Sequence, residues 1–175
     1  MGLDNVTGQV EDLAAWDTEF RMIEVFNASS WKADRNGTVR DWFALLNTGR
    51  PMFAVGSSDS HGIDGSPVGY PRTCLTLGTD DPRALNDDMI RDASNNGHSY
   101  VSGGVYMDVN VPTGSTGSLG ETVTGVGATV GVDVRVQIAS WIQGDFVMDV
   151  IIDGEVVETL DIDDVVANER YDDTV

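Results

Sequence analysis

The sequence contains one lysine, one cysteine and two histidines, and its basic residues number only 10 in a chain of 175. With 29 acidic residues, the formal net charge is −19. A surface this negative repels the phosphates of nucleic acids and of anionic membranes, so neither is an expected partner. The acid excess itself has three open interpretations: solvated polar faces, adaptation to a saline source, or a calcium-binding surface. No acidic stretch has the spacing of an EF-hand loop.

Other absences narrow the class of protein. No apolar run approaches the ~18 residues of a membrane span, and the N-terminus lacks the basic-then-apolar pattern of a secretory signal. Any such signal would precede Met1, so the compartment stays open. The lone cysteine, Cys74, lies in an apolar run and is expected to be a buried small side chain rather than a disulfide partner or a nucleophile. The apolar fraction, 41%, is enough for a core in one large domain or two small ones.

Strand-like and helix-like patterns alternate up to about residue 103. The short apolar segments Arg21–Asn27 and Met52–Gly56 are predicted strands, and apolar residues recur at helical spacing between them, from Val39 to Leu46. Such a strand–helix–strand unit makes the two strands parallel neighbours whose carboxyl ends share one edge.

Two further helices are predicted in this half of the chain. One begins at Asp80 or Asp81, has Pro82 in its first turn and ends at Gly97. The other spans Val10 to Phe20. With the strands above, they predict an α/β first half.

After residue 103 the apolar period changes to two. Alternating residues predict strands over Val105–Val111, Val130–Ile138 and Phe146–Ile152, and Asp153-Gly154 predicts a hairpin turn into a further strand. We therefore expect an antiparallel, β-sandwich-like second half. The predicted domains are residues 1–103, which are α/β, and residues 104–175, which are all-β.

The segment FAVGSSDSHG carries the chemistry that stands out most in the sequence. In extended chain, residues two apart point the same way, so Asp59 and His61 are expected to share a face while Ser60 points away. A carboxylate beside an imidazole suits a divalent transition metal such as Zn, Mn or Fe. The pair also follows a predicted parallel strand, and active sites of open α/β sheets and β/α barrels lie at that end of the strands.

Two other interpretations of this segment compete with metal binding. It fits a solvent-facing turn with an incidental histidine, since Asp-x-His alone is a weak motif. A Ser-His-Asp triad is disfavoured because the nearby serines are too close to His61 along the chain. Two ligands do not complete a metal site, and His98 is more readily a turn histidine. Glu24, with Asn27 at the end of the same predicted strand, is the best further carboxylate at this edge.

Several motifs in order resemble a known family. IEVFN, DWFALLNTGR, FAVGSSDSHG, VGYPRTCL and NGHSYVSGGV together are similar to the C-terminal part of PHP-domain (polymerase and histidinol phosphatase) metal-dependent hydrolases, in the CehA/McbA-like branch. The resemblance covers roughly residues 18 to 112, with a looser likeness in the β-rich tail.

The resemblance implies a distorted β/α barrel with a cluster of two or three divalent metals, of which this chain would form the last part. The family's final Asp-x-His metal motif falls on Asp59 and His61. The implied substrate is a small-molecule phosphoester, or a related ester or carbamate. Arg72 would contact an anionic group of the substrate or form a structural salt bridge, and Glu24 and Asn27 lie on a strand that lines the family's site.

The chain departs from the family in one decisive respect. The opening His-x-His motif and the other histidines of the family have no counterpart here, because the chain holds two histidines in all. It is therefore expected to be a fragment that binds metal weakly or not at all and is inactive alone, with the β segment packed on the barrel or forming a homodimer. The other expectation is an acidic, non-catalytic binding or interaction module.

Overall fold

The computed structural model describes residues 17, 19–28, 31–112, 117–139, 142, 144–162 and 171–174; of Trp31 and residues 171–174 it describes the backbone alone. Within this part of the chain, no helix is both long enough and apolar enough to cross a membrane. The elements, in chain order, are β1 (Met22–Asn27), α1 (Trp31–Asn36), α2 (Thr38–Asn47), β2 (Phe53–Ser57), β3 (Arg72–Leu75), the 3₁₀ turn η2 (Pro82–Ala84), α3 (Asp87–Asn96), β4 (Ser99–Ser102), β5 (Val105–Val111), β6 (Gly117–Ser118), β7 (Asp133–Ile138), β8 (Val147–Ile152), β9 (Glu155–Asp161) and β10 (Tyr171–Thr174).

β1 and β2 form the predicted parallel pair, with Asn27 opposite Ser57 at the carboxyl end. α1 and α2 connect the two strands, which confirms the strand–helix–strand unit. α2 packs against β1 and buries Val39, Ala44 and Leu45. Of the apolar residues predicted to form the buried stripe, Val39 is buried, Trp42 and Phe43 are half-buried and Leu46 is exposed. Most of the helix predicted from Val10 to Phe20 lies outside the described residues.

A side chain, rather than a ladder of backbone bonds, joins β2 to β3. The Thr73 hydroxyl accepts a hydrogen bond from Gly56 N at 2.9 Å and donates one to Gly56 O at 2.9 Å. A Cβ on Gly56 would lie 2.6 Å from a methyl group of Val101, so glycine permits this close approach. The pair β1–β2 therefore lies beside the pair β3–β4 without forming one continuous sheet with it.

α3 begins at Asp87, later than the sequence predicts. Its N-cap is Asn86, whose side chain accepts a hydrogen bond from Met89 N at 3.0 Å. Asp81 caps the short turn η2 instead. The predicted end of the helix is confirmed at Gly97, which has a φ of 71°.

The strands of the second half pair antiparallel. One sheet has the order β10-β7-β5-β6, and β8 and β9 form a separate hairpin. The predicted turn of that hairpin is confirmed, with positive φ of 54° at Asp153 and 84° at Gly154. The hairpin lies beside the helices: Arg35 Nη2 is 3.2 Å from Asp149 Oδ2, and Asn47 donates a hydrogen bond to Asp153 O.

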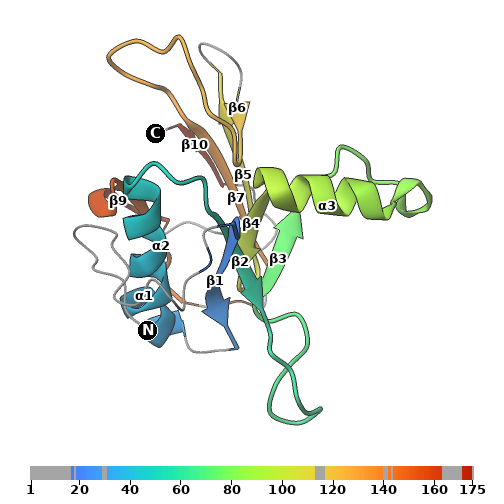
Figure 1. The fold of residues 1–175 in the computed structure, drawn as a ribbon. Helices are drawn as coiled ribbons and strands as arrows, with labels where there is room; N and C mark the ends of the chain where they lie inside the picture. Colours follow the sequence, from blue (N-terminus) through green and yellow to red (C-terminus); the bar gives the residue numbers. More distant parts are fainter. Residues whose placement is uncertain are drawn as a thin grey trace.

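The partial β/α barrel of PHP type is wrong as a description of this chain. In the described part, β1 and β2 are the sole parallel pair, and β4 returns antiparallel to β3 although α3 connects them. A barrel needs each successive strand to continue the parallel order. The β-sandwich-like second half is wrong too, because β8–β9 lies beside α1 and α2 rather than forming a second face over β5 and β7. The chain is a small β-rich protein built of separate small sheets (Figure 1).

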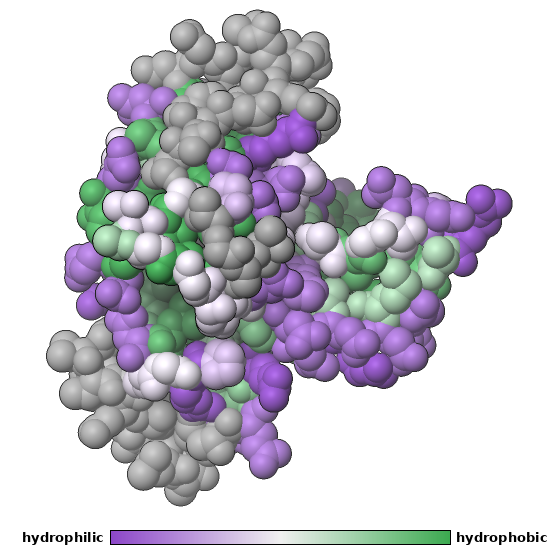
Figure 2. Space-filling model, turned by 90° about the horizontal axis from the view of Figure 1, so that it is seen from above, coloured by the Kyte–Doolittle hydropathy of each residue, from purple (hydrophilic) through white to green (hydrophobic). Residues whose placement is uncertain are grey.

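The surface combines polar cover with exposed apolar side chains. Polar residues cover the outer end of the projection that α3 and the preceding loop form (Figure 2). The β8–β9 hairpin exposes Val147, Ile152 and Val157, each by more than half. The division at residues 103 and 104 stays a prediction, although strand pairing changes between β4 and β5.

Candidate functional site

Asp59 and His61 lie in the long loop after β2, which extends away from the helices and sheets (Figure 1). Their side chains converge, with His61 Nε2 2.9 Å from Asp59 Oδ1. The predicted convergence is confirmed, but strand alternation is not its cause. β2 ends at Ser57, and Asp59 has a φ of 44°, in the left-handed region that non-glycine residues seldom adopt. A turn at Asp59 brings the two side chains together.

Two serines close this loop on itself. Ser60 Oγ donates a hydrogen bond to Ser66 O at 2.6 Å, and Ser66 Oγ donates one to Asp59 O at 3.5 Å. Since Ser60 is engaged with Ser66, it is not placed as a nucleophile for the His61 imidazole. The His61 side chain is 83% exposed and that of Asp59 is 49% exposed. Both groups are therefore accessible to a solute.

Glu24 and Asn27 meet at the carboxyl end of β1. Asn27 Nδ2 donates a hydrogen bond to Glu24 Oε2 at 3.0 Å, and the Ser57 hydroxyl donates one to Glu24 Oε1. Sequence reasoning missed Ser57, although its place opposite Asn27 in a parallel pair puts it at this edge. These three residues form a polar cluster where β2 leads into the Asp59 loop.

Arg72 is the first residue of β3, the strand beside β2. Its carbonyl oxygen lies 3.4 Å from the position that a Cβ on Gly56 would take. Its side chain is exposed to solvent. The structure thus places the Arg72 backbone beside β2 and leaves its guanidinium accessible to solvent.

Asp59 and His61 are the two side chains of this loop that the sequence predicts as metal ligands. No group of three or more His, Cys, Asp and Glu side chains suited to a metal ion occurs among the described residues. A catalytic zinc typically takes three protein ligands. The second histidine, His98, is placed just before β4, with Nε2 3.7 Å from Glu121 Oε1. Among the described residues, the structure therefore brings the two predicted ligands together without a third.

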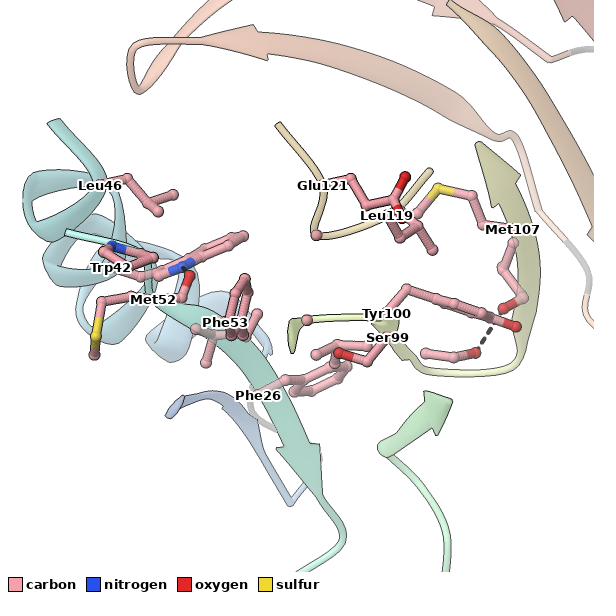
Figure 3. A pocket seen from close by; sticks show the side chains of 18 of the residues that line it. Phe26, Trp42, Leu46, Met52, Phe53, Ser99, Tyr100, Met107, Leu119 and Glu121 are labelled. Carbon is pink, nitrogen blue, oxygen red and sulfur yellow. Dashed lines mark hydrogen bonds between the residues drawn. The ribbon is translucent and has the colours of Figure 1, made fainter. Parts of the chain in front are cut away.

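An apolar cavity of about 830 Å³ lies along β2, from Phe53 at its start to Phe26 of β1, which pairs with Gly56 (Figure 3). Its walls come from segments far apart in the sequence: Trp42 and Leu46 from α2, Phe53 from β2, Tyr100 from β4, and Glu121 from the loop after β6. Sequence reasoning missed this cavity because no single segment carries a motif for it. Its volume falls within the range of small-molecule sites in proteins, ~300–1,000 Å³.

Comparison with known proteins gives no match: no protein-family model, curated protein or solved structure is significantly similar to the chain. The resemblance to PHP-domain hydrolases therefore stays a prediction that rests on the ordered motifs alone.

Proposed function

We propose that the chain contributes Asp59 and His61 to the divalent-metal centre of a metal-dependent hydrolase, of the kind that the PHP-like motifs imply. The observation that carries the proposal is the convergence of the two side chains, 2.9 Å apart, in a loop just beyond the carboxyl end of a parallel strand pair. The left-handed backbone of Asp59 adds support, since strained residues cluster at functional sites.

The chemistry of the two groups fits Zn, Mn or Fe. Such a metal, when bound, would lower the pKa of a coordinated water and stabilise an anionic transition state. The substrate class is a small phosphoester, or a related ester or carbamate. Arg72 would bind its anionic group, and Glu24 and Asn27 would supply hydrogen bonds at the same edge. The proposal places the missing ligands on polypeptide outside the described residues, and it does not require a barrel in this chain.

The two histidines make a sharp test possible. Mn²⁺ is titrated into the full chain while the imidazole proton signals of His61 and His98 are followed by NMR, because this paramagnetic ion broadens nearby signals even when it binds weakly. We expect His61 to broaden first, with a dissociation constant in the millimolar range or weaker, and Asp59→Asn to abolish the selectivity. His98, beside the carboxylate of Glu121, is the internal control.

Equal broadening of both histidines would remove the metal assignment. An assay with a chromogenic phosphate ester is expected to show no turnover by this chain alone. Tight binding of several metal ions together with turnover would contradict the proposal that this chain supplies only two ligands of the metal centre.

A non-catalytic binding module is the second candidate function, and the apolar cavity favours it. Neither Asp59 nor His61 is among the described residues that line the cavity. Ligand binding in the cavity, with no His61-selective effect of Mn²⁺, would favour this function over the hydrolase.

A further inference from the structure

The apolar cavity has walls rich in aromatic rings. Phe26, Trp42, Phe53, Tyr70 and Tyr100 all line it. Figure 3 shows Trp42 and Leu46 at one end, Met107 at the other, and Glu121 with Leu119 across from Tyr100. A lining of this kind buries a flat or branched apolar ligand, and each ring presents a negatively polarised face.

The described lining of the cavity carries a single charged side chain, and it is negative. Glu121 is the one acidic residue among the described lining residues and no Lys, Arg or His is found among them, while His98 lies just outside the lining with Nε2 3.7 Å from Glu121 Oε1. Its Oε2 accepts a hydrogen bond from Ser118 N at 2.9 Å, which holds the carboxylate at this place on the loop. The chain as a whole carries a net charge of −19. Both the Glu121 carboxylate and the negative charge of the whole chain would repel an anionic ligand and attract a cation.

From these observations we propose that the cavity is a binding site for a small apolar organic cation, such as an aromatic or branched alkyl ammonium compound. The apolar part of the ligand lies against Trp42 and Phe53, and the ammonium group lies toward Glu121. Cations over aromatic faces gain attraction that grows as water is excluded. The site is separate from Asp59 and His61, so the inference does not depend on metal binding.

Two aromatic side chains of the cavity wall, Trp42 and Phe53, are held in place by contacts within the protein. Trp42 Nε1 donates a hydrogen bond to Met52 O at 2.9 Å, which fixes the indole between α2 and the start of β2. Met52 is 2% exposed, so this anchor is buried. Gly97 packs directly against the Phe53 ring, where any larger side chain would collide. Two of the aromatic walls are therefore held in place without a ligand.

The test uses three ligands that share a naphthalene ring and differ in charge: naphthylmethyl-trimethylammonium, naphthylmethanol and naphthoate. Calorimetry with the full chain is expected to show binding of one cation per chain, about tenfold tighter than the alcohol, with naphthoate weakest. Glu121→Gln, which keeps an acceptor for Ser118 N, should weaken the cation about fivefold and leave the alcohol unchanged. Trp42→Leu should weaken the cation and the alcohol alike, because Trp42 contacts the naphthalene ring that both carry.

Glu155→Gln is the matched control, because it removes one charge from the exposed β9 strand outside the lining. It should leave all three affinities unchanged. The proposal is overturned if naphthoate binds as tightly as the cation, or if Glu155→Gln weakens the cation as much as Glu121→Gln does. It is also overturned if no probe binds, or if the chain forms a dimer that covers the cavity and excludes every probe.

Discussion

At the scale of single residues, Tyr100 has an environment that titration can detect. Burial raises the pKa of Tyr100 to about 12, and a hydrogen bond with the Cys74 side chain adds to the rise. The pKa of an unfolded tyrosine is ~10, so the folded protein holds this proton more tightly. The resulting contribution to stability is present below ~pH 10 and is lost as the pH rises through about 12.

We therefore expect the tyrosinate absorbance of the native protein to show a late titration step that Tyr100→Phe removes. Tyr70→Phe is the control, since Tyr70 is exposed and outside this contact, and it should keep the late step. If Tyr100→Phe leaves the late step in place, a tyrosine other than Tyr100 has the raised pKa. The partners of Tyr100 lie on other strands: Cys74 is opposite it on β3, and Tyr106 stacks edge-on at 6.1 Å.

Residue-scale prediction from sequence succeeds where the interaction is local. Asp59 and His61 converge as predicted, but through a left-handed residue that strand alternation does not anticipate. Asn86 rather than Asp80 or Asp81 caps α3, because several polar residues precede the helix and only the final backbone path decides which side chain reaches the first turn.

At the scale of elements, the ends of two helices offer a matched pair of substitutions. Gly97 ends α3 with φ 71°, and Gly49 follows α2 with φ 77°. A Cβ at Gly97 would collide with the Phe53 ring, whereas one at Gly49 would meet nothing within 4 Å. Gly49→Ala should therefore lower the free energy of unfolding by ~1–2 kcal/mol, which is the cost of holding alanine in a left-handed conformation.

Gly97→Ala should cost ~2–5 kcal/mol of unfolding free energy, since displacement of a packed ring adds ~1–3 kcal/mol to the ~1–2 kcal/mol of the left-handed backbone. Urea unfolding of both variants measures the difference. Equal losses of stability would mean that the Phe53 ring moves freely into the cavity, which would also weaken the argument for a rigid wall.

The sequence does not predict the direction in which β4 pairs with β3. The sequence pattern of β3, α3 and β4 resembles that of β1, α2 and β2, yet the first set pairs antiparallel and the second parallel. Hydrophobic periodicity identifies each element and its buried side, but the choice of neighbour and its direction depends on contacts far along the chain. The hairpin at Asp153-Gly154 was predictable because its turn is local.

At the scale of the whole molecule, charge is the dominant feature. A net charge of −19 makes the compact state repel itself, and salt screens that repulsion over a Debye length of ~10 Å at 0.1 M and ~3 Å at 1 M. We expect the melting temperature to rise between low and high sodium chloride. A gain of ~1 kcal/mol corresponds to ~2–4 °C at this size. A sucrose series is the uncharged control, and a flat response to salt would show that repulsion among the acidic side chains does not limit the stability of the folded state.

One side chain bridges the β1–β2 pair and the β3–β4 pair by hydrogen bonds. Thr73 occupies the place of a neighbouring strand for Gly56, offering its hydroxyl to both the N–H and the C=O of that residue. Valine has nearly the same shape as threonine and is common in strands, but it would leave both backbone groups without this partner. Natural variants of the sequence should therefore show threonine or serine at this position, where a strand would ordinarily tolerate any β-branched residue.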